Sequence, residues 1–212
     1  MIIGITGKTA TGKTAAALHL KKMMKDSILL DLDKIAKEIY CEDEEVLKDL
    51  QNCFGRQVFC SDGTVNYKAL ANKVFSSKAE LDKLNNLMLG PIEKKVQSLL
   101  KKNKDRKYII IDAAVLFNTG LCKLCDYIIL VRTWKKRQMQ FLKIKCMLSN
   151  SLYGSPESLK ENEIEDEIGL RIRGQHIKIN KKLVDFVIDN EGSLADLYKK
   201  VEIIAQKIMK KY

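Results

Sequence analysis

The stretch GKTATGKT, at residues 7–14, decides the fold of this 212-residue chain. It fits the spacing G-x-x-x-x-G-K-[ST] in one way, with its first glycine at position 7 and the remainder at Gly12, Lys13 and Thr14. The earlier GKT triplet does not fit, because its partner glycine would have to stand at Ile2. A loop with this spacing turns its backbone N–H groups toward phosphate oxygens. The stretch therefore predicts a phosphate-binding loop, or P-loop.

The residues on either side of the loop supply the context that the motif needs. The apolar run MIIGIT predicts a buried strand, and residues 13–25 have the spacing of a helix. In this arrangement Lys13 would reach the β- and γ-phosphates of a nucleoside triphosphate, and Thr14 would hold Mg²⁺. Lys8 is interpreted as a solvated charge at the rim, with an added phosphate contact as the alternative. The predicted nucleotide-binding residues are Gly7, Lys8, Thr9, Ala10, Thr11, Gly12, Lys13, Thr14 and Ala15.

Strands and helices alternate along the rest of the chain. Apolar runs predict further strands at 27–33, 107–117, 126–132 and 184–193. The segments between them predict helices, and such alternation is typical of a three-layer α/β fold with a parallel sheet. Residues 67–103 are expected to be helical throughout, apart from a break at Gly90–Pro91, and to form a small subdomain.

The net charge and the length of the apolar runs indicate which partners the protein binds and where in the cell it is located. The net charge is +11, from 38 basic and 27 acidic residues. A lysine-rich, solvated surface accounts for this value, and attraction to nucleotides or nucleic acid is the functional alternative. No apolar run reaches the roughly 18 residues of a transmembrane helix, and MIIGITG is too short for a secretory signal. The sequence therefore predicts a cytoplasmic protein that starts at Met1.

Six cysteines are scattered along the chain, and only Cys122 and Cys125 lie close together. A single C-x-x-C pair is half of a zinc site or a redox pair. No second pair is present, and neither His19 nor His176 has metal-ligand spacing to it. Free thiols in a reducing cytoplasm are the preferred interpretation.

A P-loop alone fits ATPases, GTPases and small-molecule kinases, so it does not identify the acceptor of the phosphoryl group. The N-K-x-D motif of guanine-specific GTPases is absent. The second predicted strand ends in LLDLDKIAKEIY, which places Asp31 and Asp33 on one face near the carboxyl edge of the sheet, where ligands bind. A carboxylate there accepts a proton from an acceptor hydroxyl or holds Mg²⁺. The alternative is that both acids only cap the next helix.

Fragments along almost the whole chain match the motifs of one kinase family in their order. They are IGITGKTATGKT, LLDLDKIAKEIY, FG followed by SDGTVNYKALANKVF, LNNLMLGPIEKKV, IIIDAAVLFNTGLCKLCDYIILV, RIRGQ and VDFVIDNEGS. In this order they resemble the motifs of dephospho-CoA kinases, which phosphorylate the ribose 3′-hydroxyl of dephospho-CoA with ATP. The shared order is more specific than any one fragment except the P-loop. The resemblance implies ATP and Mg²⁺ as cofactors and dephospho-CoA as the small-molecule substrate, with no membrane or nucleic-acid partner.

The resemblance also implies roles for individual residues. Asp33 would be the base or orienting acid for the ribose hydroxyl, and Asp112 would lie near Mg²⁺ and the substrate. The implied catalytic residues are Asp33, Lys13, Lys145 and Arg171. The implied metal ligands are Thr14 and Asp112. Asn190 and Gly192 match the loop beside the adenine of ATP.

The same resemblance divides the chain into functional parts. It implies a P-loop kinase core at 1–66, 104–144 and 172–212. Residues 67–103 would be a helical CoA-binding subdomain, and residues 145–171 would be a lid that closes over the phosphates. Arg171 and Gln175 match a segment next to this lid.

Several positions depart from the family pattern. Tyr67 stands in place of an arginine, Gly90 in place of a histidine and Asn118 in place of an acid. In the lid motif, Phe141 and Lys145 replace two arginines. Lysine stabilises phosphoryl charge as a point charge, without the bidentate fork of arginine. The P-loop and Asp33 are retained, so the prediction of ATP and Mg²⁺ binding does not depend on the changed positions, whereas the acceptor does.

Three alternative functions use the same motifs. A nucleoside or nucleotide kinase shares the P-loop core. A tRNA dimethylallyltransferase has a P-loop like TATGKTAAAL, but its D-S-x-Q-x-Y segment is absent here. A non-catalytic ATP-binding paralogue would explain the changes at Tyr67, Gly90 and Asn118, but the retained Asp33 and Lys13 argue against it.

Overall fold

The computed structural model describes residues 1–152, 168 and 177–211. The chain divides into two compact units: a core unit of Met1–Leu29 with Asp105–Tyr212, and a helical unit of Leu30–Lys104. The helical unit is larger than the 67–103 segment expected from the sequence, because it takes in residues 30–66 as well. None of the helices in the described part of the chain has the length and apolar character needed to cross a membrane.

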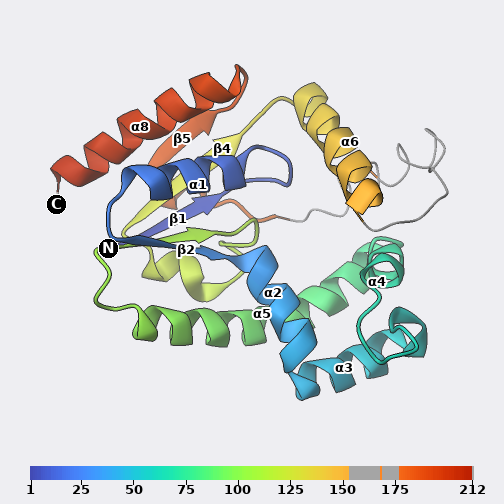
Figure 1. Ribbon diagram of the computed structural model, residues 1–212. Coiled ribbons are helices and arrows are strands. Elements are labelled where there is room, and N and C mark those ends of the chain that lie inside the picture. Colours follow the sequence, from blue (N-terminus) through green and yellow to red (C-terminus); the bar gives the residue numbers. More distant parts are fainter. Residues whose placement is uncertain (153–167, 169–176, 212) are drawn as a thin grey trace. The chain divides into compact units, whose positions relative to one another are not determined.

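A five-stranded sheet in the order β2-β3-β1-β4-β5 runs through the core unit (Figure 1). The strands are β1 (Ile2–Thr6), β2 (Ser27–Asp31), β3 (Tyr108–Asp112), β4 (Tyr127–Arg132) and β5 (Phe186–Asp189). β1 pairs in parallel with β3 and with β4, and β4 pairs in parallel with β5. All five residues of β3 are buried, as expected for a parallel strand covered on both faces. The predicted α/β class with a parallel sheet is confirmed.

Helices α1 (Lys13–Met23) and α8 (Leu194–Lys210) lie beside each other against the sheet (Figure 1). Their buried side chains join those of the strands in one hydrophobic cluster. α1 contributes Ala16, Ala17 and Leu20, and the two small residues allow its backbone to lie close to the sheet. The N-terminus of α1 is thereby fixed directly after β1, where the P-loop connects them.

The sequence of α8 specifies both its start and its buried face. Ser193 and Asp196 form a capping box: the Ser193 hydroxyl accepts from the backbone N–H of Asp196 at 3.2 Å, and the Asp196 carboxylate accepts from that of Ser193 at 2.8 Å. The buried residues recur at helical spacing, at Leu197, Val201, Ile204, Ala205 and Ile208. This capped helix begins just after residues 190–192, and it fixes where that loop ends.

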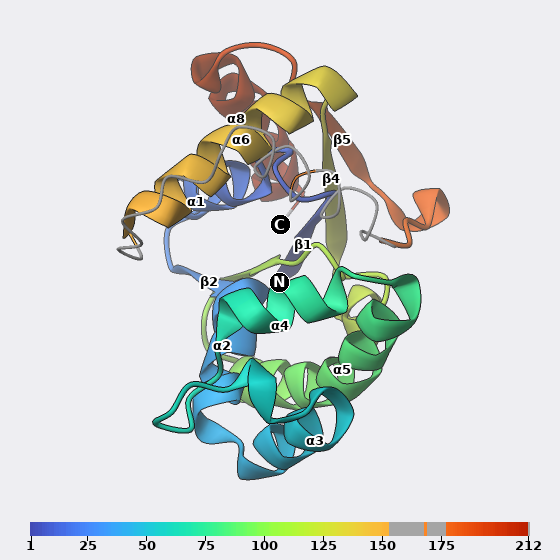
Figure 2. The ribbon, with the colours of Figure 1, turned by 90° about the vertical axis from the view of Figure 1, so that its right-hand side faces the viewer.

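The helical unit consists of α2 (Leu32–Glu42), α3 (Glu44–Phe54), α4 (Tyr67–Val74) and α5 (Lys78–Lys102) (Figure 2). α5 is the longest of them, and each of the other three packs against it. Side-chain caps start them: Asp31 for α2, Asp43 for α3, Asn66 for α4 and Ser77 for α5. The unit is therefore an arrangement of short capped helices around one long helix.

The predicted helix break at Gly90–Pro91 is wrong, because α5 continues through both residues. A proline inside a helix lacks the N–H that would bond the carbonyl four residues earlier, which costs about 3 kcal/mol. Met88, Ile92 and Val96 lie on one buried stripe that spans the proline. Packing of this stripe on both sides of Pro91 compensates for the missing hydrogen bond.

The second predicted strand is shorter than the sequence pattern indicated. β2 ends at Asp31, and Leu32 already begins α2, so Asp33 lies in the first turn of a helix. The expectation that strand alternation places both acids on one face is therefore wrong. Asp31 Oδ1 accepts from the backbone N–H of Asp33 at 3.0 Å and from that of Lys34 at 3.3 Å. This capping ends the strand at Asp31, and the side chain of Asp33 takes no part in it.

Candidate nucleotide-binding site

The P-loop connects β1 to α1 through backbone conformations that favour glycine. Gly7 has φ 143° and Gly12 has φ 92°, and between them Ala10 also has a positive φ of 60°. A side chain at position 7 would meet the carbonyl oxygen of Val131, and one at position 12 would meet the side-chain amide of Asn190. Both motif glycines are therefore required by backbone angle and by close contact.

Three carbonyl groups of the loop accept hydrogen bonds from side chains of the protein. The Thr9 carbonyl accepts from Gln138 Nε2 at 2.8 Å, and the Thr11 carbonyl accepts from Asn190 Nδ2 at 2.9 Å. The Lys8 carbonyl accepts from the Thr11 hydroxyl at 2.9 Å. A phosphate cradle needs its amides, and not its carbonyls, turned toward the anion. These bonds hold the loop in a conformation of that kind.

The two lysines of the loop differ in burial. Lys13, the first residue of α1, is only 9% exposed, whereas Lys8 is exposed. Among the described residues Lys13 has no ion-pair partner. A buried ammonium group is costly unless an anion compensates its charge. The arrangement therefore favours an anionic ligand at the start of α1, where the helix dipole also attracts one.

Thr14 and Asp112 present two oxygen groups beside the loop. The Thr14 hydroxyl donates to Asp112 Oδ2 at 2.7 Å. Asp112 ends β3 and is 5% exposed, whereas Thr14 is exposed. A hydroxyl and a carboxylate are hard oxygen donors of the kind that Mg²⁺ binds while keeping water and phosphate ligands. The described residues contain no group of three or more His, Cys, Asp or Glu suited to a metal ion.

The loop after β5 lies against the P-loop. Asn190 is 4% exposed; its backbone N–H donates to the Arg132 carbonyl at 2.8 Å, and its carbonyl accepts from the Thr133 hydroxyl at 2.7 Å. With the bond from its side chain to Thr11, these contacts fix Asn190 in place. Gly192 follows in the same loop. The structure thus brings Asn190 and the P-loop together.

Helix α6 (Lys135–Leu152) adds contacts that the sequence patterns did not reveal. Arg137 Nη1 donates to the Glu191 carbonyl at 2.9 Å, and Nη2 donates to the Gly192 carbonyl. No motif marked Arg137, because its partners are backbone carbonyls more than fifty residues away in the chain. Its neighbour Gln138 lies in the same helix as Phe141 and Lys145, the two positions of the lid motif named above.

The other predicted catalytic residues are Asp33, Lys145 and Arg171, and the structure describes only Asp33 in full. Asp33 is an exposed residue of the helical unit, in the first turn of α2. Lys145 lies in α6, and its side chain is outside the described part of the chain. Arg171 and Gln175 fall outside the described residues altogether. The structure therefore leaves the roles of these residues as predictions.

The positions that depart from the family pattern have defined surroundings. Tyr67 is 40% exposed, packs edge to face on Tyr40 with ring centroids 5.9 Å apart, and has Lys37 Nζ 6.0 Å from its ring centroid. Gly90 faces open space on α5, with room for a side chain. Asn118 accepts through Oδ1 from the backbone N–H of Lys178 at 3.2 Å.

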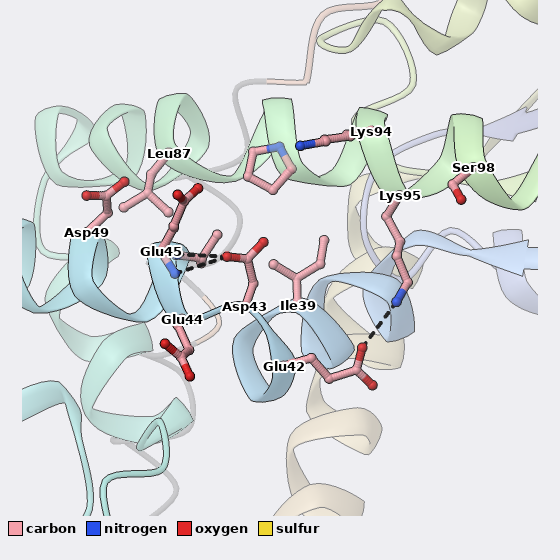
Figure 3. A pocket seen from close by; sticks show the side chains of 12 residues that line it. Ile39, Glu42, Asp43, Glu44, Glu45, Asp49, Leu87, Lys94, Lys95 and Ser98 are labelled. Atoms are coloured by element: carbon pink, nitrogen blue, oxygen red, sulfur yellow. Dashed lines mark hydrogen bonds and ion pairs between the residues drawn. The ribbon is translucent and has the colours of Figure 1, made fainter.

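A pocket of about 670 Å³ lies within the helical unit (Figure 3). Five acidic side chains line it, among them Glu42 and Asp43, and only two basic ones, Lys94 and Lys95. Glu42 is paired with Lys95 Nζ at 3.1 Å, and Asp43 caps α3 through its bonds to the backbone N–H groups of Glu45 and Val46. An acidic pocket of this kind repels phosphate groups, so it is a poor site for a phosphorylated ligand.

The thiols of the C-x-x-C pair are free and half-buried. Burial, and then the neighbouring Cys122, raises the pKa of Cys125 to about 12. A thiol held in its protonated form is a poor nucleophile and a poor metal ligand. Cys125 therefore has the chemistry of a packed side chain.

Comparison with known proteins identifies the family. The model of the dephospho-CoA kinase family matches residues 1–196. A dephospho-CoA kinase of Fusobacterium nucleatum is 32% identical over 211 residues, which cover 98% of each chain.

Solved structures show the same fold at lower sequence identity. TT1252 from Thermus thermophilus has a TM-score of 0.67 at 22% identity, covering 98% of this chain and 97% of that one. The dephospho-CoA kinase from Campylobacter jejuni has a TM-score of 0.59 at 20% identity, covering 99% and 98%. The P-loop geometry, the parallel sheet and the family match over residues 1–196 agree: this chain belongs to the dephospho-CoA kinase family.

Proposed function

We propose that this chain transfers the γ-phosphoryl group of ATP to the ribose 3′-hydroxyl of dephospho-CoA, which gives coenzyme A and ADP. The family match over residues 1–196 carries the proposal. The buried Lys13 at the start of α1 supports a nucleoside triphosphate as the donor, because it places a cation where the phosphates would lie.

The donor side of the reaction rests on the core unit. P-loop amides and Lys13 would bind the β- and γ-phosphates, and Asn190 and Gly192 would flank the adenosine. Thr14 and Asp112 would hold a Mg²⁺ ion, which neutralises charge on the phosphates when it is bound. The hydrogen bond of 2.7 Å between Thr14 and Asp112 supports this assignment, because it already brings the two oxygens together.

The acceptor side is assigned to the helical unit, with Asp33 as the base. Asp33 would accept the proton of the ribose 3′-hydroxyl as that oxygen attacks the γ-phosphorus and ADP leaves. Its exposure in the first turn of α2 supports this role, because its carboxylate is accessible to a substrate. The Asp31 carboxylate caps α2 by accepting hydrogen bonds from its first backbone N–H groups, so Asp31 is the weaker candidate for the base.

Residues 145–171 are proposed as a lid that excludes water from the phosphates. Lys145 and Arg171 would stabilise the negative charge that develops during transfer. The helical unit would bind dephospho-CoA, and the protein would act in the cytoplasm. The pocket of Figure 3 is not part of this proposal, because its acidic lining opposes a phosphorylated acceptor.

Phosphoryl transfer by the purified protein tests the proposal directly. With ATP and Mg²⁺, we expect transfer to dephospho-CoA and none to nucleosides or nucleoside monophosphates. Transfer to a nucleoside monophosphate alone would replace the proposal with a nucleotide kinase. ATP binding without any transfer would favour the non-catalytic paralogue.

A matched pair of lysine variants tests the donor site. Lys13→Ala removes the buried ammonium group and is expected to weaken ATP binding and lower turnover together. Lys22→Ala removes an exposed charge from the same helix and is expected to leave both unchanged. Equal effects of the two changes would show that net charge, and not the position of Lys13, governs ATP binding.

A further inference from the structure

Two adjacent residues of α6 reach two different loops of the core unit. Gln138, which is 5% exposed, donates from Nε2 to the Thr9 carbonyl of the P-loop at 2.8 Å. Arg137 donates from Nη1 to the Glu191 carbonyl at 2.9 Å and from Nη2 to the Gly192 carbonyl. The start of α6 thus connects the P-loop to the loop that follows β5.

The two loops are also bonded directly to each other. Asn190 donates from Nδ2 to the Thr11 carbonyl at 2.9 Å, and a side chain on Gly12 would collide with this amide. β1, β4 and β5 are parallel, so both loops leave the carboxyl edge of the sheet, where nucleotides bind in α/β proteins. A triphosphate in the P-loop therefore has the 190–192 loop beside it.

We propose that Arg137 is a positioning residue for the nucleotide donor. It holds the carbonyls of residues 191 and 192 and so keeps the loop in the shape that receives the nucleoside part of ATP. It acts through this loop and has no contact with the reacting atoms. The inference rests on the proposed function only in taking ATP as the P-loop ligand.

The geometry suits arginine and no other side chain. One planar guanidinium bridges two successive carbonyls, which a lysine ammonium on a flexible stem does not reproduce. The guanidinium carbon also lies 5.0 Å from the centroid of the Phe141 ring, one helical turn later. This contact orients the guanidinium, so Phe141, a departure from the family's lid motif, supports the function of Arg137.

Variants at Arg137 test the proposal through ATP affinity measured without the acceptor. Calorimetric titration with ATP–Mg²⁺ is expected to give a Kd about tenfold higher for Arg137→Met, because two charge-assisted hydrogen bonds are lost. Arg137→Lys, which keeps the charge, is expected to recover only a small part of this affinity. Lys136→Met removes an exposed charge from the same turn and is expected to leave the Kd unchanged.

The outcomes separate positioning from general damage to the fold. We expect the KM for ATP to rise in Arg137→Met while the KM for dephospho-CoA and the thermal midpoint change little. An unchanged Kd for ATP in Arg137→Met overturns the proposal. So does an equal rise in both KM values with a large fall in the midpoint.

Failure of the proposed function gives a different result. A wild-type protein that binds ATP but transfers nothing to dephospho-CoA contradicts that function, and the Kd comparison still decides the role of Arg137.

Discussion

Replacing Asn190 tests the bond that joins the loop after β5 to the P-loop. Asn190 is 4% exposed, and its Nδ2 lies 2.9 Å from the carbonyl oxygen of Thr11, a residue that is 2% exposed. Asn190→Ala removes the only donor of this bond and leaves a buried carbonyl. Such a loss costs about 1–3 kcal/mol, because the carbonyl has given up water without gaining a partner. We expect the free energy of unfolding to fall by that amount.

Asn190→Asp separates hydrogen bonding from packing. It preserves the volume but places a carboxylate oxygen opposite the Thr11 carbonyl, so that two acceptors face each other in a buried place. Burial of an unpaired charge is more costly than loss of one hydrogen bond. We therefore expect Asn190→Asp to be less stable than Asn190→Ala, even though it is closer in shape to the wild type.

Urea unfolding followed by circular dichroism measures both effects, with Asn52→Ala as the control. Asn52 is exposed on α3, so its replacement is expected to change stability by no more than about 0.5 kcal/mol. An Asn190→Ala protein as stable as this control would refute the role given to the amide. An Asn190→Asp protein more stable than Asn190→Ala would refute the account of two opposed acceptors.

Three further predictions concern catalysis, thiol chemistry and pH. Asp33→Asn is expected to lower kcat by about 10²–10⁴-fold while ATP still binds, because the proposed proton acceptor is lost. Steady-state kinetics and a calorimetric titration with ATP measure the two effects. Unchanged turnover would remove Asp33 from the mechanism. Alkylation read by mass spectrometry is expected to modify the exposed Cys41 well before Cys125, because burial raises the pKa of Cys125 to about 12; comparable rates would contradict the protection. Hydrogen bonding from Arg132 holds the pKa of Asp189 below its usual range, so the stability that this pair adds is present at neutral pH and is lost as the pH falls through the lowered pKa. The stability difference between wild type and Asp189→Asn should accordingly shrink from neutral pH to about pH 3, and a difference that grows would show the opposite linkage.

The parts of the fold that depend on local spacing could be predicted from the sequence. The positions of Gly7 and Gly12 follow from the motif, and the structure gives the physical reason: positive φ angles and close contacts with Val131 and Asn190. The parallel sheet follows from apolar runs separated by helices. In each case the information lies within a few consecutive residues.

The features that the sequence did not reveal depend on contacts between distant segments. Pro91 is tolerated in α5 because Met88 and Ile92 are buried on either side of it, and their burial depends on helices elsewhere in the chain. The role of Arg137 depends on carbonyls of residues 191 and 192, which have no side-chain signature. Asp33 was placed on a strand because propensity alone does not show that the Asp31 cap starts α2 so early.

The order of the strands has a consequence for how the chain folds as it is synthesised. β1 leaves the ribosome well before its partners, because they are distant in the chain: Ile2 pairs with Ile109, and Ile3 pairs with Tyr127. At about 5–20 residues per second, the first strand waits roughly 5–20 seconds for a neighbour. The helical unit is a continuous segment, Leu30–Lys104, and it is complete before that neighbour emerges. The P-loop is thus translated well before the loop after β5, which bonds to it through Asn190.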